Sequence, residues 1–393
     1  MGIPRLRAYA GPAVLSYGFR PFFLLGPLYA CLSIVLWLPM YAGELDTYSA
    51  FVPVDWHIHE MLFGYLPAIV TGFLLTAIPN WTGRLPVQGL PLLWLVVLWL
   101  LGRVAVFFSA DIGWQAAAVT DGSFLLAVAA VAAREIIAGR NWRNLKVLLP
   151  LAVLACANGA FHIEAHIQGA SDVSRRLGMA AAIMLISIIG GRIIPSFTRN
   201  WLVRENPGRL PAPFGRLDMA SIGISVSALA AWTFAPSNSV SGLLLATAAI
   251  SQTWRLSRWA GERTSRDPLV LILHLAYAFV PLGLALLSAS IFFPGIVPAE
   301  AGLHTLGAGA IGSMTLAVMA RATLGHTGRQ LRAGRPATFI FTAILVAALS
   351  RILGVFVPND AIIHLAGAAW ALAFGGFLLT YGVALTTPRA HAA

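Results

Sequence analysis

Residues 57–79, HIHEMLFGYLPAIVTGFLLTAIP, contain the pattern that decides the fold of this chain. A helix needs about 20 apolar residues to cross a bilayer, and this stretch is long enough. After Glu60 it carries no acidic or basic side chain. Ionisable groups in hydrocarbon are costly, so they are kept where they pair, line a cavity or bind something. The stretch therefore predicts a transmembrane helix whose polar beginning has a function.

Apolar stretches of this kind recur along the whole chain. Hydrophobic residues make up 58% of the 393 residues and charged residues 10%, whereas soluble domains carry roughly 25% charged residues. The mean hydropathy is +0.79. The sequence predicts an all-α membrane protein with a single polytopic domain over residues 1–393. Its twelve expected transmembrane helices cover residues 20–42, 57–79, 90–108, 114–137, 146–168, 177–194, 217–235, 240–260, 268–293, 301–322, 337–357 and 360–386.

The basic residues behind the net charge of +11 are concentrated in alternate connections between the predicted spans. Basic residues collect after the second, fourth, sixth, eighth and tenth predicted spans, as with Arg140 and Arg143, whereas acidic residues such as Glu44 and Asp46 occupy the opposite connections. This is the positive-inside pattern, which predicts that both the N- and C-termini lie in the cytoplasm. Because topology accounts for the charge, we expect the lipid bilayer as a partner and no nucleic acid.

Histidines gather at one end of the predicted bundle. Seven of the nine lie in or at the ends of apolar segments, and six of those seven fall at the outer membrane face. Imidazole is the commonest protein ligand for metals. We therefore expect a metal or haem site near the periplasmic side, the alternative being interfacial histidines bonded to water. The six residues are His57, His59, His162, His166, His304 and His364.

Spacing divides these histidines into groups. On a helix His57 and Glu60 share a face, whereas His59 points to a different side. His162 and His166 are four residues apart, which suits two ligands of one metal ion. Several imidazoles without thiolates favour copper or zinc. The predicted metal ligands are His57, Glu60, His162, His166 and His364.

A weak internal repeat relates the second, sixth and tenth predicted spans. A shift of 245 residues places His59 on His304, and a shift of 116 places Pro79 on Pro195. The alternative is that glycine-rich helices ending in arginine look alike by composition. True repetition predicts three four-helix units in a pseudo-three-fold arrangement, with repeat units over residues 1–140, 141–265 and 266–393.

This arrangement resembles the catalytic subunit of haem–copper oxidases, which has twelve spans in three four-helix arcs. There a low-spin haem is held by one histidine on span two and one on span ten, and the resemblance implies this role for His59 and His304. The chain departs from that family because predicted spans six and seven contain no histidine for a binuclear centre. It also lacks a C-x-x-C-H motif, so a haem would be of the non-covalent b type.

Two arginines lie inside predicted spans, Arg103 in the third and Arg351 in the eleventh. Guanidinium groups bind carboxylates in bidentate fashion, so both arginines are candidates for anchoring haem propionates. The alternative is an intramembrane ion pair, for example between Arg103 and Asp121.

Four motifs, SYGFRPFFLLG at residues 16–26, HIHEMLFGY at 57–65, IPNWTGR at 78–84 and GRIIPSFTRN at 191–200, resemble those of the NnrS family. The resemblance covers essentially the whole chain. It implies a bacterial inner-membrane protein that contains haem and copper, is made in response to nitric oxide, and is associated with denitrification and nitrosative-stress defence.

Two classes of function follow. The first is a haem and copper protein that binds or converts nitric oxide or protects against it. A redox enzyme would need a quinol or an electron-donor protein, because no soluble electron-transfer domain is present, and catalytic residues stay unassigned. The second is a proton-coupled secondary transporter of a metal or small molecule. Transporter sites usually lie near the bilayer midplane, whereas these histidines cluster near one face. A transient handler of haem or copper is a third reading.

Overall fold

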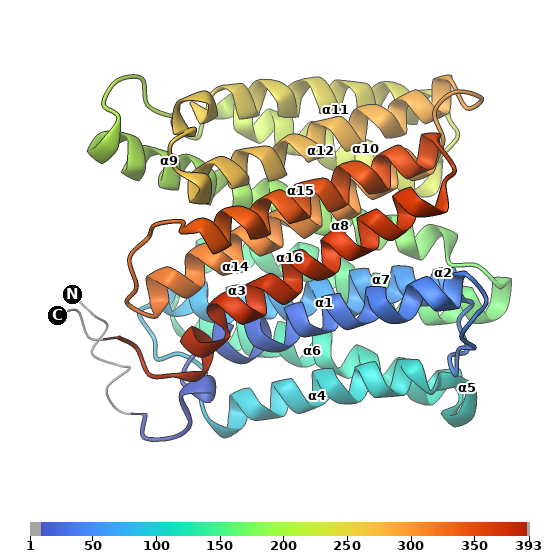
Figure 1. The fold of residues 1–393 in the computed structure, drawn as a ribbon, viewed down its shortest axis with the longest axis horizontal. Coiled ribbons are helices and arrows are strands. Elements are labelled where there is room, and N and C mark those ends of the chain that lie inside the picture. Colours follow the sequence, from blue (N-terminus) through green and yellow to red (C-terminus); the bar gives the residue numbers. More distant parts are fainter. Residues whose placement is uncertain (1–8, 391–393) are drawn as a thin grey trace. The chain divides into compact units, whose positions relative to one another are not determined.

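The computed structural model describes residues 9–390, and in this part of the chain every regular element is helical. Eleven of the described helices are long and apolar enough to cross a membrane, which confirms an all-α, multi-pass membrane protein (Figure 1). They are α1 (Phe19–Tyr41), α2–η3–α3 (Pro53–Thr82), α4 (Leu90–Phe107), α6 (Trp114–Ala138), η4–α7 (Trp142–Gln168), α8–η5–α9 (Asp172–Glu205), α10 (Arg216–Phe234), α12 (Pro268–Phe292), α13–η7–α14 (Ala299–His326), α15 (Arg335–Phe356) and α16 (Asp360–Thr386).

The predicted twelfth span, residues 240–260, is α11 (Ser239–Ser257). It is a helix of 19 residues, but it does not count among the eleven apolar spans. Serine and threonine recur along it, and Gln252 and Arg255 are buried inside the protein. These polar residues lower the hydropathy of α11. They are tolerated because Gln252 and Arg255 form hydrogen bonds with protein partners. Twelve spans and a three-fold arrangement therefore stay predictions.

Three spans contain a π-helical segment. The first is η3 (Glu60–Tyr65) between α2 (Pro53–His59) and α3 (Leu66–Thr82). The second is η5 (Ile186–Gly190), and the third is η7 (Thr305–Gly312). Such segments are rare and frequently mark functional sites. The three interrupted helices are the predicted spans two, six and ten.

The π segments η3 and η7 begin at equivalent places. His59 is the last residue of α2 and His304 the last residue of α13 (Ala299–His304), and a π segment follows each directly. The repeat at a shift of 245 residues thus extends from sequence to local backbone structure. Two helices extend beyond the predicted ends of their spans. The predicted sixth span ends at residue 194, whereas α9 (Gly191–Glu205) continues to Glu205. The predicted tenth span ends at residue 322, whereas α14 (Ser313–His326) continues to His326.

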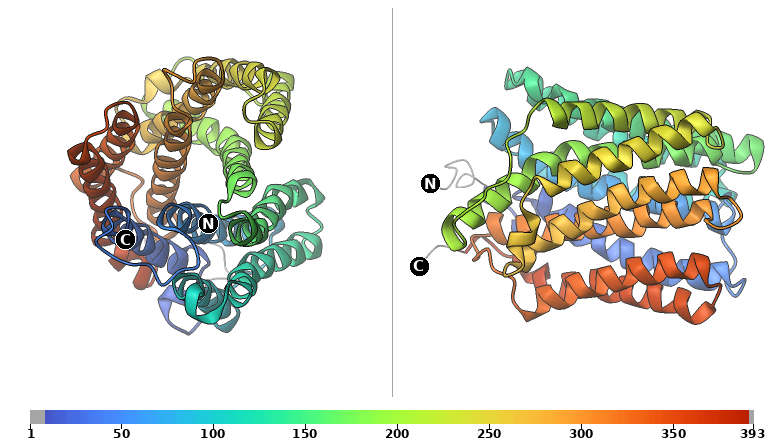
Figure 2. Two further views of the ribbon diagram at one scale, coloured as in Figure 1. Left: turned by 90° about the vertical axis from the view of Figure 1, so that its right-hand side faces the viewer. Right: turned by 90° about the horizontal axis from the view of Figure 1, so that it is seen from above.

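The chain divides into two compact units (Figure 2). In the first unit, formed by Met1–Gly178, Ala322–Gln330 and Phe377–Ala393, the α2–η3–α3 helix contacts α1, α4, α6 and α7. In the second unit, formed by Met179–Arg321 and Leu331–Gly376, α12 contacts α11, α13, η7 and α15, and α10 packs on α11.

Glycines end two helices of the first unit where the sequence places them. Gly83 has a φ of +71°, and its amide donates a hydrogen bond of 2.9 Å to the Pro79 carbonyl at the end of α3. Gly169 has a φ of +73° and caps α7 (Leu148–Gln168) in the same way, with Ala165 as the acceptor. A left-handed residue after the last helical turn favours glycine because it has no Cβ. These two caps set the ends of the helices that carry the candidate site.

Buried charge in the second unit is held by a separate polar group. Arg255 on α11 pairs with Asp218 on α10 at 3.0 Å and is buried. Its Nη1 donates to the Ser187 carbonyl in η5 and to the Tyr277 hydroxyl on α12, each at 2.9 Å. The arginine therefore joins four segments of this unit.

Helices α1 and α3 approach closely through small residues. A Cβ built on Gly72 would meet the ring of Phe23 on α1 at 2.8 and 2.9 Å and the Cβ of Phe22 at 3.1 Å. Without a hydrophobic driving force between helices in lipid, such close approach supplies the packing attraction. The contact fixes α3 against α1 below the polar end of the same helix.

We expect Gly72→Val to destabilise the protein by about 1–3 kcal/mol, the range for overpacking a filled interior. Gly122→Val on α6 is the matched control, because a Cβ there meets no atom within 4 Å. Both are the same glycine-to-valine change within a helix and alter helix propensity alike, so the difference between the two unfolding free energies in detergent isolates the α1–α3 contact. Equal losses for the two variants would contradict this packing argument.

Candidate metal centre

A buried polar cluster occupies one end of the first unit, where η3 begins. Five of its elements contribute side chains: α1, the α2–η3 junction, α4, α6 and α7. All members except the half-buried Tyr29 are at least nine-tenths buried. The members are Tyr29, His59, Glu60, Arg103, Asp121, Asn158 and His162.

Arg103 is the cation of this cluster. Its Nη1 donates to both carboxylate oxygens of Glu60, at 2.7 and 2.6 Å, and its Nη2 pairs with Asp121. The Tyr29 hydroxyl donates a further hydrogen bond to Glu60. Buried charges in a membrane are kept by pairing, and this pairing is the ion-pair alternative that the sequence left open for Arg103. Two carboxylates face one guanidinium, so a negative charge is left over when both imidazoles are neutral.

His59 is held with both ring nitrogens facing oxygen atoms. Its Nδ1 lies 2.8 Å from a Glu60 carboxylate oxygen, which can only accept a hydrogen bond from it. Its Nε2 lies 3.0 Å from Asn158 Oδ1 and 3.3 Å from Asp121 Oδ2. The Asn158 amide nitrogen donates to the same Asp121 oxygen at 2.8 Å, which fixes the orientation of the amide. The Nε2 edge therefore faces only acceptors, so it requires a proton or a metal cation.

His162 completes the cluster from α7. Its Nε2 lies 3.3 Å from Asp121 Oδ2, and its Nδ1 is buried without a hydrogen-bond partner. Buried polar atoms without partners are uncommon in native proteins. The ring centroids of His59 and His162 are 4.9 Å apart. One ligand atom each from His59, Asp121 and His162 lie within 4.8 Å of one another, so a single metal ion could contact all three.

Aromatic side chains enclose this pair of imidazoles. The ring of His59 lies 5.1 Å from Phe51, 5.4 Å from Phe63 and 5.2 Å from Phe161, measured between centroids. Phe51 also contacts His162 at 5.1 Å. The two imidazoles are thus surrounded by apolar rings. A low local dielectric constant of this kind strengthens the electrostatic interactions among the charged side chains of the cluster.

Two other predicted ligands of the first unit, His57 and His166, lie outside the polar cluster. His57 stacks on Trp37 with a centroid distance of 4.3 Å and is half-buried. His166 is exposed and stacks on Trp114 at 4.5 Å. Glu60, predicted to share a face with His57, is a member of the cluster, where it bonds to His59 and begins the π segment η3.

The remaining predicted site residues belong to the second unit. His304 ends α13 and is half-buried, and Arg351 lies half-buried within α15. His364 is exposed in the first turns of α16, where its Nδ1 donates to the Asp360 carbonyl at 2.7 Å. Their assignment as haem or metal ligands stays a prediction.

Sequence reasoning misses three members as site residues. It identifies Asp121 only as an ion-pair partner of Arg103, and it gives no role to Asn158 or Tyr29. A signal exists for Asp121 and Asn158: each is a polar residue inside an apolar span, and Asn158 precedes His162 by four residues, one turn on the same helix face.

Comparison with known families gives a match over nearly the whole chain. The family model described as NnrS protein matches residues 13–389. No curated protein matches the chain. The matched range contains every member of the polar cluster and residues of both units.

Removing the cation tests whether Arg103 holds the site together. We expect Arg103→Leu to cost about 3–5 kcal/mol of unfolding free energy, because it leaves Glu60 and Asp121 buried without their counter-charge. Arg134→Leu is the control, since that arginine is exposed and its partner Glu135 keeps a second ion pair with Arg84, so we expect a loss of at most about 1 kcal/mol. Denaturant unfolding in detergent compares the two, and an equally small loss for both would refute the structural role.

Proposed function

Because this chain belongs to the NnrS family, we propose that it is a membrane protein of the nitric-oxide response that holds a copper ion between His59, Asp121 and His162. The observation that carries the proposal is the convergence of two imidazoles and one carboxylate within 4.8 Å, inside a membrane-spanning helix bundle. The family resemblance is the basis for proposing nitric oxide and copper. The geometry of the three side chains is the basis for the proposed position of the ion.

The donor set fits a transition metal. Imidazole ligands suit copper, zinc and iron, and the carboxylate adds charge compensation. The negative charge left over by Glu60, Asp121 and Arg103 favours a bound cation. A copper ion in this site would supply one-electron chemistry and a coordination position for nitric oxide.

The surrounding residues match what a metal site needs outside its ligands. Metal-bound histidines usually donate their second ring N–H to a carboxylate or carbonyl, which fixes the tautomer and orients the ring. The Glu60 carboxylate accepts such a hydrogen bond from Nδ1 of His59, and Arg103 and Tyr29 in turn hold Glu60 in place. His59 is thereby oriented with its Nε2 toward Asp121.

We propose His59 as a ligand of the copper ion instead of a haem, because Phe51, Phe63 and Phe161 surround its ring and a single ion needs less space than a macrocycle. We keep the haem b implied by the resemblance on His304, with Arg351 as the candidate propionate partner. His57, His166 and His364 are not part of this proposed copper site, and their role as metal ligands stays a prediction from the sequence.

Topology and partners follow the sequence. We propose that both termini face the cytoplasm of a bacterial inner membrane, which the basic residues of alternate connections support, and that the three π-containing spans belong to three repeated four-helix units. Turnover of nitric oxide would require electrons from a quinol or a donor protein.

Copper content tests the centre directly. We expect the wild-type protein to retain copper after chelator dialysis, His162→Ala to lose it, and Glu60→Gln to bind it roughly 10–100-fold more weakly. His166→Ala is the matched histidine control and should keep wild-type copper. Elemental analysis measures the content, and the copper electron paramagnetic resonance signal with and without nitric oxide reports access. A wild type free of copper, or full copper in His162→Ala, would overturn the proposal.

The visible absorption spectrum separates the haem assignment from the copper assignment. We expect reduced b-type peaks in the wild type and in His59→Ala, and their loss in His304→Ala. If His59→Ala loses the haem instead, the oxidase-like pairing of His59 with His304 is right and the copper role of His59 is wrong. A protein with neither metal would favour the transporter.

A further inference from the structure

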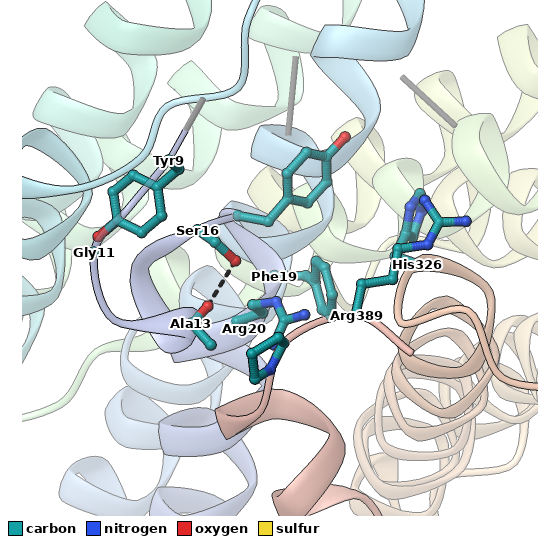
Figure 3. Close-up of a pocket in the computed structure, with 10 residues that line it drawn as sticks. Tyr9, Gly11, Ala13, Ser16, Phe19, Arg20, His326 and Arg389 are labelled. Atoms are coloured by element: carbon teal, nitrogen blue, oxygen red, sulfur yellow. Dashed lines mark hydrogen bonds between the residues drawn. The ribbon is translucent and has the colours of Figure 1, made fainter. Parts of the chain in front are cut away.

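A second candidate site lies in the first unit, away from the metal centre. At the end of the unit where α1 begins and α14 and α16 end, a cavity of about 200 Å³ opens between the helix termini (Figure 3). Ser16, Tyr17, Phe19, Arg20, His326 and Arg389 contribute to its wall, and none of the described lining residues is acidic. In Figure 3 Arg20 and the pair His326 and Arg389 lie on opposite sides of Phe19.

Two of the arginines are held in place without any counter-charge. Arg20 donates from Nη1 to the carbonyls of Leu385 and Thr387, at 3.0 and 2.6 Å, so it binds the end of α16. These described bonds use only one of its guanidinium nitrogens. Arg389 makes no ion pair with any residue that the structure describes.

A third guanidinium increases the positive charge. Arg329 lies close enough to Arg20 for the two like charges to repel. Its Nη1 is buried and has no hydrogen-bond partner among residues 9–390. A buried charged donor without a partner costs free energy. Two guanidinium groups, Arg20 and Arg389, and the His326 imidazole thus line one cavity that has no carboxylate in its described wall, and Arg329 adds positive charge next to Arg20.

The surrounding structure is ordered by specific contacts. The His326 ring packs against Tyr17 and Phe19, with centroid distances of 5.7 and 5.6 Å. The Ala390 amide donates to the Thr327 carbonyl at 3.0 Å, which fixes the segment that carries Arg389. Burial raises the pKa of Tyr17 to about 12, so its hydroxyl stays neutral and adds no negative charge.

We propose that this cavity binds a phosphate group, either the headgroup of an anionic phospholipid or a free phosphate ion. Guanidinium groups match phosphate oxygens in bidentate geometry, and an anion would offset the repulsion among Arg20, Arg329 and Arg389. The volume is several times the roughly 30 Å³ that one water occupies, which leaves room for a phosphate. The proposal is independent of the metal centre.

Two measurements distinguish the two sources. In the first, inorganic phosphate replaces chloride at constant ionic strength, and the thermal unfolding midpoint of delipidated protein in detergent is followed. In the second, native mass spectrometry counts phosphatidylglycerol retained from mixed phosphatidylglycerol and phosphatidylcholine micelles. Arg389→Gln is the main variant because Arg389 makes no described ion pair, so folding should be spared. Arg329→Gln is the second variant.

Arg143→Gln is the matched control, since Arg143 is an exposed arginine in the connection between α6 and α7. We expect Arg389→Gln to weaken binding roughly tenfold or more, the loss of one charge-assisted hydrogen bond. Arg329→Gln should weaken it less, because Arg329 acts only through its charge beside Arg20, and Arg143→Gln should leave it unchanged. A response to phosphate alone assigns the free ion, and selective retention of phosphatidylglycerol assigns the lipid. If wild type and both variants behave alike in both measurements, the proposal is overturned.

Discussion

The high cost of charge in hydrocarbon is the constraint on which the first unit depends. Arg103 on α4 satisfies two carboxylates, Glu60 on η3 and Asp121 on α6, and so ties three separate spans at one depth. The second unit solves the same problem with Arg255, Asp218 and the backbone of Ser187. In both units a π segment takes part in the polar group, which links the widened helix to the place where charge is buried.

The ion pair also determines what the histidines can do. Glu60 is held by Arg103, and Glu60 in turn holds Nδ1 of His59, so the opposite edge of the imidazole is directed at Asp121. His162 reaches the same carboxylate from α7. A ligand set of this kind is preorganised, because each ligand has little freedom to lose when a cation binds. The surrounding aromatic rings raise the free-energy cost of leaving the excess negative charge of this ligand set without a cation.

Much of the fold could be predicted from the sequence, and less of the site. Apolar length and the placement of basic residues gave an all-α membrane protein, and the shift that aligns His59 with His304 reappears in two π segments. The sequence grouped Glu60 with His57 from a helix-face argument that assumes 3.6 residues per turn, whereas in the structure Glu60 is hydrogen-bonded to His59 and begins a π segment. Asp121 and Asn158 are contributed by α6 and α7, and no spacing within one helix indicates which other helix lies opposite.

The bond between Arg20 and the end of α16 has a consequence for how the protein is made. Arg20 and Thr387 are 367 positions apart in the chain, and a ribosome adds roughly 5–20 residues per second. The arginine of the first span therefore waits roughly 20–70 s for its acceptors to be synthesised. During this interval its long side chain can reach water and headgroups at the span end. The first unit can therefore close only after the end of α16 has been synthesised.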